Sequence, residues 1–307
     1  MTKKTIPQKL AKLLPPFIRE WVRIFYLLHG LKAKLRWDGD ISAWIVHRPF
    51  SNPDKKMPVV VRSFKEFRRI AQFGKNQEDI VYHWLHAIKD CKVFYDIGAA
   101  NGLEGFLCHH LHDSKVCFVE PFTASIETIM RNVYVLAKRD GSHDKFEVVH
   151  AGANDQSYYD RAFMLCPPKA GETQISFSDP NSYERRGRVF NPVTSQWVFG
   201  ISIDEMHMKY KMDVPTHVKI DVDGFEHRVI NGAINTIKSQ DVISWAIEIT
   251  GEENLTHIDK IMTDNGYEEI ARWEHYPGLP ARTFDIIYSL PAHVDYFKKA
   301  ILTIRAY

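Results

Sequence analysis

The chain has few cysteines, no long apolar run and no large excess of charge of either sign. Its four cysteines contain no Cys-x-x-Cys pair and no secreted-type spacing, and we expect Cys91, Cys108 and Cys117 to be buried and reduced. No apolar stretch reaches the ~18–20 residues that cross a bilayer, and no signal-peptide cleavage pattern is visible. The net charge of +2 gives no reason to expect nucleic acid as a partner. These absences favour a cytoplasmic protein.

Residues 1–40 are basic and amphipathic. Apolar side chains recur there at helical spacing, and the lysines and arginines face few acids. Such a helix packs on the rest of the protein or on a second subunit of a homo-oligomer, or it lies on the inner face of an anionic membrane. We favour packing, because an apolar helical stripe is usually core. Strands at 41–48 and 58–62 predict a small hairpin, so residues 1–76 form an N-terminal extension.

The remainder, residues 77–307, alternates between strands and helices. Strands that alternate with helices at this spacing predict an α/β fold with a doubly wound, mainly parallel sheet and helices on both faces. Residues 166–196 interrupt the pattern with many prolines and glycines, and we expect either a substrate lid or a solvated loop there. The predicted strands are 92–98, 115–120, 146–151, 157–165, 217–222, 243–250, 268–275 and 283–289; the predicted helices are 64–73, 77–89, 102–111, 123–138, 225–238 and 253–265.

The strand expected at 92–98 runs into a glycine turn, Asp96-Ile-Gly-Ala-Ala-Asn-Gly102, and the following strand ends in Val119-Glu-Pro121. Gly98 and Gly102 let the chain turn tightly and approach a ligand closely, at the strand end where open α/β sheets bind ligands. Glu120 is placed to accept hydrogen bonds from ribose hydroxyls. The carboxylate of Asp96 suits S-adenosylmethionine better than a pyrophosphate, which an anion would repel.

A second motif, Lys219-Ile-Asp-Val-Asp-Gly-Phe-Glu226, places three acids at the end of another strand. Asp221 is our first candidate for a general base, and Glu248 at the next strand end is the second. Asp223 and Glu226 would orient an acceptor, although Glu226 would also suit the N-terminus of a helix. The alternative role for these acids is to bind a divalent cation, whose ligands would be Asp221, Asp223 and Glu248.

These motifs resemble those of the FkbM family of S-adenosylmethionine-dependent methyltransferases. The similar blocks are the glycine turn, Val119-Glu-Pro121, the acidic motif followed by Gly232-Ala233, and Trp245-Ala-Ile-Glu-Ile249; the resemblance covers about residues 78–290. It implies a Rossmann-like class I methyltransferase fold, a seven-stranded sheet with the last strand antiparallel. It also implies O-methylation of a sugar, a polysaccharide or a related natural product.

The resemblance also assigns the cofactor contacts, position by position. The methionine part of S-adenosylmethionine would lie at the glycine turn, the ribose at Glu120 and the adenine near Asn154 and Asp155. This chain has Ala100 where the family usually has Asn, which comes one place later, and Asp223 where the family more often has Glu. The complete set expected at the cofactor is Asp96, Gly98, Ala100, Asn101, Gly102, Glu120, Pro121, Asn154, Asp155 and Asp221.

Three other functions fit parts of the sequence. Asp221-Val-Asp223 is an Asp-x-Asp tripeptide, as in metal-dependent glycosyltransferases, but that function leaves the glycine turn unexplained. A nicotinamide oxidoreductase would use a glycine turn followed by an acid, but Asp96 opposes it and no Tyr-x-x-x-Lys pair is placed for hydride chemistry. A methyltransferase fold that only binds a partner is the third. The acceptor we expect is a sugar or glycan.

Overall fold

The computed structural model describes residues 33–50, 56–74, 79–164, 193–275 and 282–305, with a few isolated residues and short strands between them. The chain divides into two compact units, Met1–Gln72 and Phe73–Tyr307, and each is described by itself. The division falls a few residues before residue 76, where we expected the N-terminal extension to end.

The first unit holds a three-stranded antiparallel sheet in the order β1-β2-β3, followed by a helix. The predicted hairpin is present as β2 and β3, but residues 34–38 form the strand β1 where we expected a helix. Trp37 of β1 lies opposite Trp44 of β2 and packs edge-on against it at 5.3 Å, so a cross-strand aromatic pair outweighs the helical pattern. The rest of the expected helix falls almost wholly outside the described residues. The bounds are β1 Lys34–Asp38, β2 Ala43–Arg48, β3 Met57–Val61 and α3 Phe64–Gln72.

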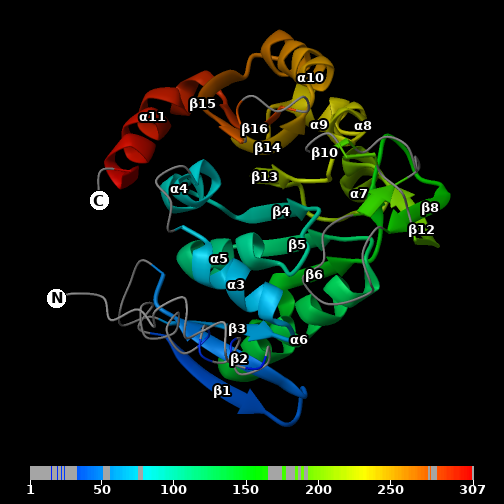
Figure 1. Ribbon diagram of the computed structural model, residues 1–307. Helices are drawn as coiled ribbons and strands as arrows, with labels where there is room; N and C mark the ends of the chain where they lie inside the picture. The colour runs from blue at the N-terminus through cyan, green and yellow to red at the C-terminus, as the bar shows by residue number, and fades with distance from the viewer. Residues whose placement is uncertain are drawn as a thin grey trace. The chain divides into compact units, whose positions relative to one another are not determined.

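The second unit is built on a seven-stranded sheet in the order β15-β16-β14-β13-β4-β5-β6 (Figure 1). Neighbouring strands are parallel except at β16, which runs antiparallel to both of its neighbours. The predicted class I methyltransferase sheet, with its last strand antiparallel, is therefore confirmed. The strands are β4 Val93–Ile97, β5 Lys115–Val119, β6 Phe146–Val149, β13 His217–Ile220, β14 Ser244–Thr250, β15 Glu268–His275 and β16 Thr283–Ser289.

Helices cover both faces of this sheet (Figure 1). On one face α8, α9 and α10 enclose a large apolar core with alternate strand residues such as Tyr95, Val218 and Trp245. On the other face lie α4, α5 and α11, where Trp84 of α4 donates from Nε1 to Ser244 Oγ at 2.9 Å. The bounds are α4 Ile80–Ala87, α5 Leu103–His112, α6 Thr123–Asp140, α8 Glu226–Asn231, α9 Ile234–Ser239, α10 Glu252–Asp264 and α11 Pro291–Arg305, with a 3₁₀ turn η1 at Ser142–Lys145.

The alternation of side chains along each strand decides which polar residues share a face. Ser244 points toward α4, so Glu248, four residues on in the same strand, points to that face as well. Asp96 and Lys219 are cross-strand partners in β4 and β13 and also lie on this face, because Asp96 accepts a hydrogen bond from Gly105 of α5. Asp96 and Glu248, two of the acids predicted to carry function, therefore lie on the same face of the sheet.

The helix predicted at 225–238 is two short helices, α8 and α9, separated at Gly232. A Cβ on Gly232 would lie 2.3 Å from the carbonyl oxygen of Asn154. The close approach of the backbone around Asn154 therefore explains why glycine stands here.

A second sheet has the order β7-β12-β8-β9, and its strand β8 lies where we predicted a strand at 157–165. We did not predict β12, which pairs antiparallel with β8, nor α7 and α11. Most of the expected lid, residues 166–196, falls outside the described residues, so its role stays a prediction. The bounds are β7 Gly152–Ala153, β8 Tyr159–Met164, β9 Ile175–Phe177, β10 Glu184–Arg185, β11 Arg188–Val189, β12 Thr194–Ile201 and α7 Ile203–Met208.

Cys91, Cys108 and Cys117 are buried and free, as predicted. Helices long and apolar enough to cross a bilayer are absent from the part of the chain that the structure describes.

Candidate active site

The turn between β4 and α5 has the tight geometry that its glycines predict. Gly98, Ala100 and Gly102 have φ angles of 71°, 50° and 76°. A Cβ on Gly98 would lie 1.8 Å from the carbonyl oxygen of Asp221, so the two strand ends meet here without room for a side chain. The two motifs found in the sequence therefore share one edge of the sheet.

Glu120, directly after β5, is tied to this turn. Its Oε2 accepts a hydrogen bond from the amide of Ala100 at 2.7 Å, and its Oε1 accepts one from the amide of Phe122 at 2.8 Å. Burial raises the pKa of Glu120 to about 7, against the lowering effect of these two hydrogen bonds. Each carboxylate oxygen has a second lone pair. Glu120 can therefore hold the turn and still accept hydrogen bonds from a ribose.

Lys219 is a buried cation that links the two motifs. Its Nζ lies 3.4 Å from Asp96 Oδ1 and 3.5 Å from Asp221 Oδ2, and it donates to the carbonyl oxygen of Gly98 at 3.2 Å. Its side chain is only 5% exposed. The sequence reasoning assigned no role to Lys219. The feature that could have indicated one is a lysine within an apolar strand, two residues before an acid.

Asp96 lies beneath the turn. It is 0% exposed, and its Oδ2 accepts a hydrogen bond from the amide of Gly105 at 3.0 Å. Burial raises the pKa of Asp96 to about 6, while Lys219 opposes this shift. The contacts of Asp96 are therefore internal and fasten α5 to β4. Its predicted contact with the methionine end of a cofactor stays a prediction.

Asn101 is the polar side chain of the turn with most capacity left for a ligand. It is buried, and within the described residues neither its Oδ1 nor its Nδ2 has a hydrogen-bond partner. Buried amides in proteins are nearly always paired. The amino and carboxylate groups at the methionine end of S-adenosylmethionine would suit an amide that both donates and accepts. The turn therefore fits this cofactor.

Asn154 and Asp155 follow β7. Asn154 is buried; its Nδ2 donates to the hydroxyl of Tyr158 at 2.6 Å and its Oδ1 accepts from the amide of Asp155 at 2.9 Å. These contacts stabilise the turn after β7, and the adenine contact of both residues stays a prediction.

Pro121 accepts a hydrogen bond from Gln196 Nε2 at 2.7 Å through its carbonyl oxygen, which holds β12 beside the end of β5.

Three of the four predicted catalytic acids lie together. Asp221, Asp223 and Glu248 each offer an oxygen within 4.8 Å of the others, and the side chain of Asp221 is partly exposed. Glu226 does not join them: it is 0% exposed and its Oε1 accepts a hydrogen bond from the amide of Gly224 at 2.7 Å. Burial raises the pKa of Glu226 to about 8. Glu226 therefore supports the turn at the start of α8, which favours its structural interpretation over contact with an acceptor.

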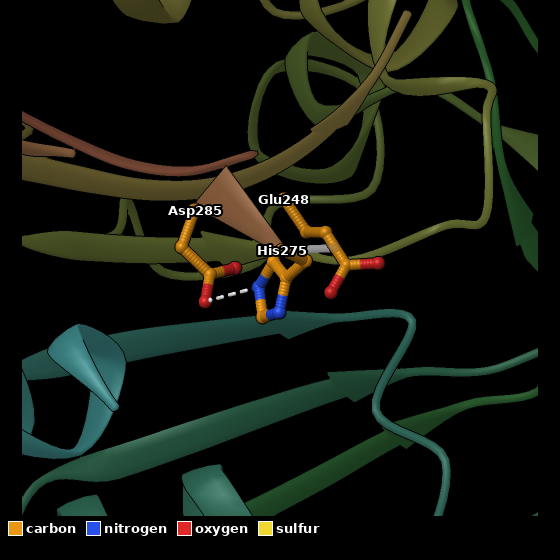
Figure 2. A group of neighbouring side chains, drawn as sticks. All are labelled: Glu248, His275 and Asp285. Atoms are coloured by element: carbon orange, nitrogen blue, oxygen red, sulfur yellow. Dashed lines mark hydrogen bonds and ion pairs between the residues drawn. The ribbon is translucent and has the colours of Figure 1, made fainter. Parts of the chain in front are cut away.

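Two side chains that we did not single out from the sequence lie beside Glu248. Figure 2 shows the imidazole of His275 between the carboxyl groups of Glu248 and Asp285. His275 Nε2 and Asp285 Oδ2 are hydrogen-bonded at 2.8 Å. No local motif marks these residues, because their approach depends on how β14, β15 and β16 pair.

A comparison with known families identifies the domain. The sequence profile of the methyltransferase FkbM domain matches residues 96–269, more than half of the chain. The chain belongs to the FkbM methyltransferase family. The predicted family and enzyme class are thereby confirmed at the level of the family.

Known structures similar to this FkbM-family chain include two methyltransferases. One is the methyltransferase FkbM from Methylobacillus flagellatus KT, with 14% sequence identity and a TM-score of 0.44. The match covers 71% of this chain and 59% of that protein, so less than two thirds of that protein is matched. Another is precorrin-6y C5,15-methyltransferase from Geobacter metallireducens GS-15, at 13% identity and a TM-score of 0.40 over 71% of this chain and 91% of the other. No curated protein is significantly similar to the chain in sequence.

Proposed function

We propose that this FkbM-family protein transfers a methyl group from S-adenosylmethionine to a hydroxyl oxygen of a sugar, a glycan or a related natural product. S-Adenosylmethionine supplies a methyl group already activated on a sulfonium. The observation that carries the proposal is the contact between Gly98 and the carbonyl of Asp221, because it brings the cofactor turn against the acids. Asn101 and Glu120 would hold the cofactor there.

Asp221 is the general base in this proposal. Its ion pair with Lys219 Nζ, at 3.5 Å, restricts the position of the carboxylate. An ionised carboxylate within reach of the acceptor can take the proton that the hydroxyl loses, an effect worth roughly 10²–10⁴-fold. Glu248 is the second candidate for this role, and Asp223 would orient the acceptor.

An exposed aromatic face on the second sheet supports a sugar acceptor. Tyr159 and Trp197 are 69% and 65% exposed, unusually high for such large apolar rings. The cross-strand partners Arg161 and Trp197 also form a cation–π pair, with the guanidinium 5.3 Å from the ring. Aromatic rings stack on the C–H faces of sugars, and arginine binds the carboxylates of acidic sugars. The bond from Gln196 to Pro121 holds β12, the strand that carries Trp197, beside the residue that follows Glu120.

Calorimetry with S-adenosylhomocysteine, NADH and UDP-glucose tests the cofactor. We expect binding of S-adenosylhomocysteine in the micromolar range, which corresponds to about −8 kcal/mol, and no binding of the other two. Binding of NADH or UDP-glucose instead of S-adenosylhomocysteine would replace methyl transfer by oxidoreduction or glycosyl transfer.

Methyl transfer to a panel of mono- and polysaccharides tests the base. Asp221→Asn should lower turnover about 10²–10⁴-fold while leaving the affinity for S-adenosylhomocysteine nearly unchanged. The matched control is Asp264→Asn, because Asp264 is an exposed acid on α10 paired with Lys260. Near-normal turnover of Asp221→Asn would show that another group accepts the proton.

A further inference from the structure

Glu248, His275 and Asp285 form a compact group of oxygen and nitrogen donors, here named the strand-end cluster (Figure 2). The three side chains come from β14, β15 and β16, and one ligand atom of each lies within 4.8 Å of the others. Neither His275 nor Asp285 is among the residues predicted for cofactor binding or catalysis. The cluster therefore needs an explanation of its own.

The pairing of β14 with β16 places two carboxylates face to face. Glu248 and Asp285 are direct cross-strand partners, an arrangement in which like charges repel. Asp285 is only 9% exposed, so water screens this repulsion poorly. Burial raises the pKa of Asp79, at the start of α4, and the nearby charges of Asp285 and Glu104 add to this shift. Negative charge therefore accumulates around the strand-end cluster, and this favours a bound cation.

The donor types indicate which cation. A neutral imidazole adds no charge, and an imidazolium would balance only one of the two carboxylates. Imidazole together with carboxylate suits Zn²⁺ and other first-row transition ions, whereas Mg²⁺ and Ca²⁺ prefer sites made wholly of oxygen. Two ligands about 2.1 Å from one ion lie about 3 Å apart at right angles and about 3.4 Å apart at the tetrahedral angle of Zn²⁺ sites. His275 Nε2 and Asp285 Oδ2, hydrogen-bonded at 2.8 Å, would need to separate by only a few tenths of an ångström to hold an ion between them.

We propose that Glu248, His275 and Asp285 bind one divalent transition-metal ion of the Mn²⁺ or Zn²⁺ type, with water or an acceptor oxygen in the remaining positions. Glu248 also lies within 4.8 Å of Asp221 and Asp223, which puts the ion on the side of the site where the proposed acceptor would bind. A hydroxyl bound to the ion would lose its proton more readily. That catalytic role rests on the proposed methyl transfer, whereas the binding of the ion does not.

Calorimetry of the full chain, stripped of metal and free of cofactor, with MnCl₂ and ZnCl₂ tests the site. We expect one ion per chain, and affinity at least about tenfold weaker, or about 1.4 kcal/mol, in His275→Ala and in Asp285→Asn. Asp285→Asn keeps the shape of the side chain, and circular dichroism checks the fold of both variants. The control is His143→Ala, since His143 is an exposed histidine bonded to the carbonyl of Gly141 within its own turn.

The proposal is wrong if the wild-type chain binds neither ion saturably, or if all variants bind like the wild type. Loss of methyl transfer in His275→Ala without metal binding by the wild type would make His275 and Asp285 a proton-accepting pair instead. The proposed function is tested separately, by measuring binding of S-adenosylhomocysteine to the metal-free chain. If the chain does not bind S-adenosylhomocysteine but binds the metal ion, the metal site is supported and the proposed function is not.

Discussion

Replacing Lys219 by methionine tests whether the two motifs depend on each other. Methionine keeps the unbranched shape of the side chain but removes its charge. Asp96 would then be left without its cation while 0% exposed, so water cannot take the place of Lys219. Removing one partner of a buried ion pair typically costs about 3–5 kcal/mol. Because the two atoms are 3.4 Å apart, we expect the lower end of that range.

Urea unfolding of the wild type, Lys219→Met, Asp96→Asn and the double variant measures this effect. The double variant should recover much of the stability lost in Lys219→Met, because it no longer buries an unpaired carboxylate. The control is Lys260→Met, which breaks an exposed ion pair with Asp264 and should cost less than about 1 kcal/mol. Equal midpoints for Lys219→Met and Lys260→Met would refute the reasoning, as would strictly additive losses in the double variant.

Three further predictions concern the turn and its acids. Gly98→Ala should abolish binding of S-adenosylhomocysteine in calorimetry, because its Cβ would overlap the Asp221 carbonyl; Gly141→Ala, with a φ of 76° and no atom within 4 Å of the added Cβ, isolates the backbone strain. The affinity of the wild type for S-adenosylhomocysteine should rise from pH 6 to pH 8, because Glu120, with its pKa of about 7, ionises over this range. The affinity of Glu120→Gln should not change with pH. If the wild type shows the same affinity at both pH values, Glu120 does not bind the ribose. Burial raises the pKa of Glu226 from 4.5 in the unfolded chain to about 8 in the folded protein. The folded state therefore holds the proton of this carboxyl group more tightly. The stability that the protonated group contributes is fully present below pH 4.5 and is lost as the pH rises through 8. Glu226→Gln should therefore melt above the wild type at pH 8.5 but not at pH 4.5; a lower melting temperature at pH 8.5 would contradict this.

The glycine turn and the acidic motif could be predicted because their signals are local. Gly98 and Gly102 stand where the backbone needs positive φ, and short apolar runs mark the strands on either side. Strand β12 of the second sheet was missed for the opposite reason. Residues 194–201 show no regular alternation of apolar and polar side chains, and they follow a segment rich in proline and glycine. They form a strand by pairing with β8, which was predicted.

The same difference between local sequence signals and the folded backbone distinguishes the acids within one motif. From the sequence, Asp221 is the first candidate for the base, and Asp223 and Glu226 share the role of orienting an acceptor. The backbone then turns at Asp223 and Gly224, with φ angles of 53° and 105°, and Glu226 is directed inward to the amide of Gly224. The change of direction depends on two dihedral angles that no spacing rule reports. For His275 and Asp285 the missing information is the register of β14 with β16 and of β16 with β15.

The contacts suggest that cofactor binding and acceptor chemistry can be separated by mutation, with Lys219 as the exception. Glu120 and Gly98 lie at the ends of β5 and β4, and the residues of the strand-end cluster lie in β14, β15 and β16. Changes on one side should therefore alter mainly affinity for the cofactor, and changes on the other mainly turnover or metal binding. Lys219 contacts Asp96 on the first side and Asp221 on the second. A change at Lys219 should lower both cofactor affinity and turnover, even though this lysine need touch neither the cofactor nor the acceptor.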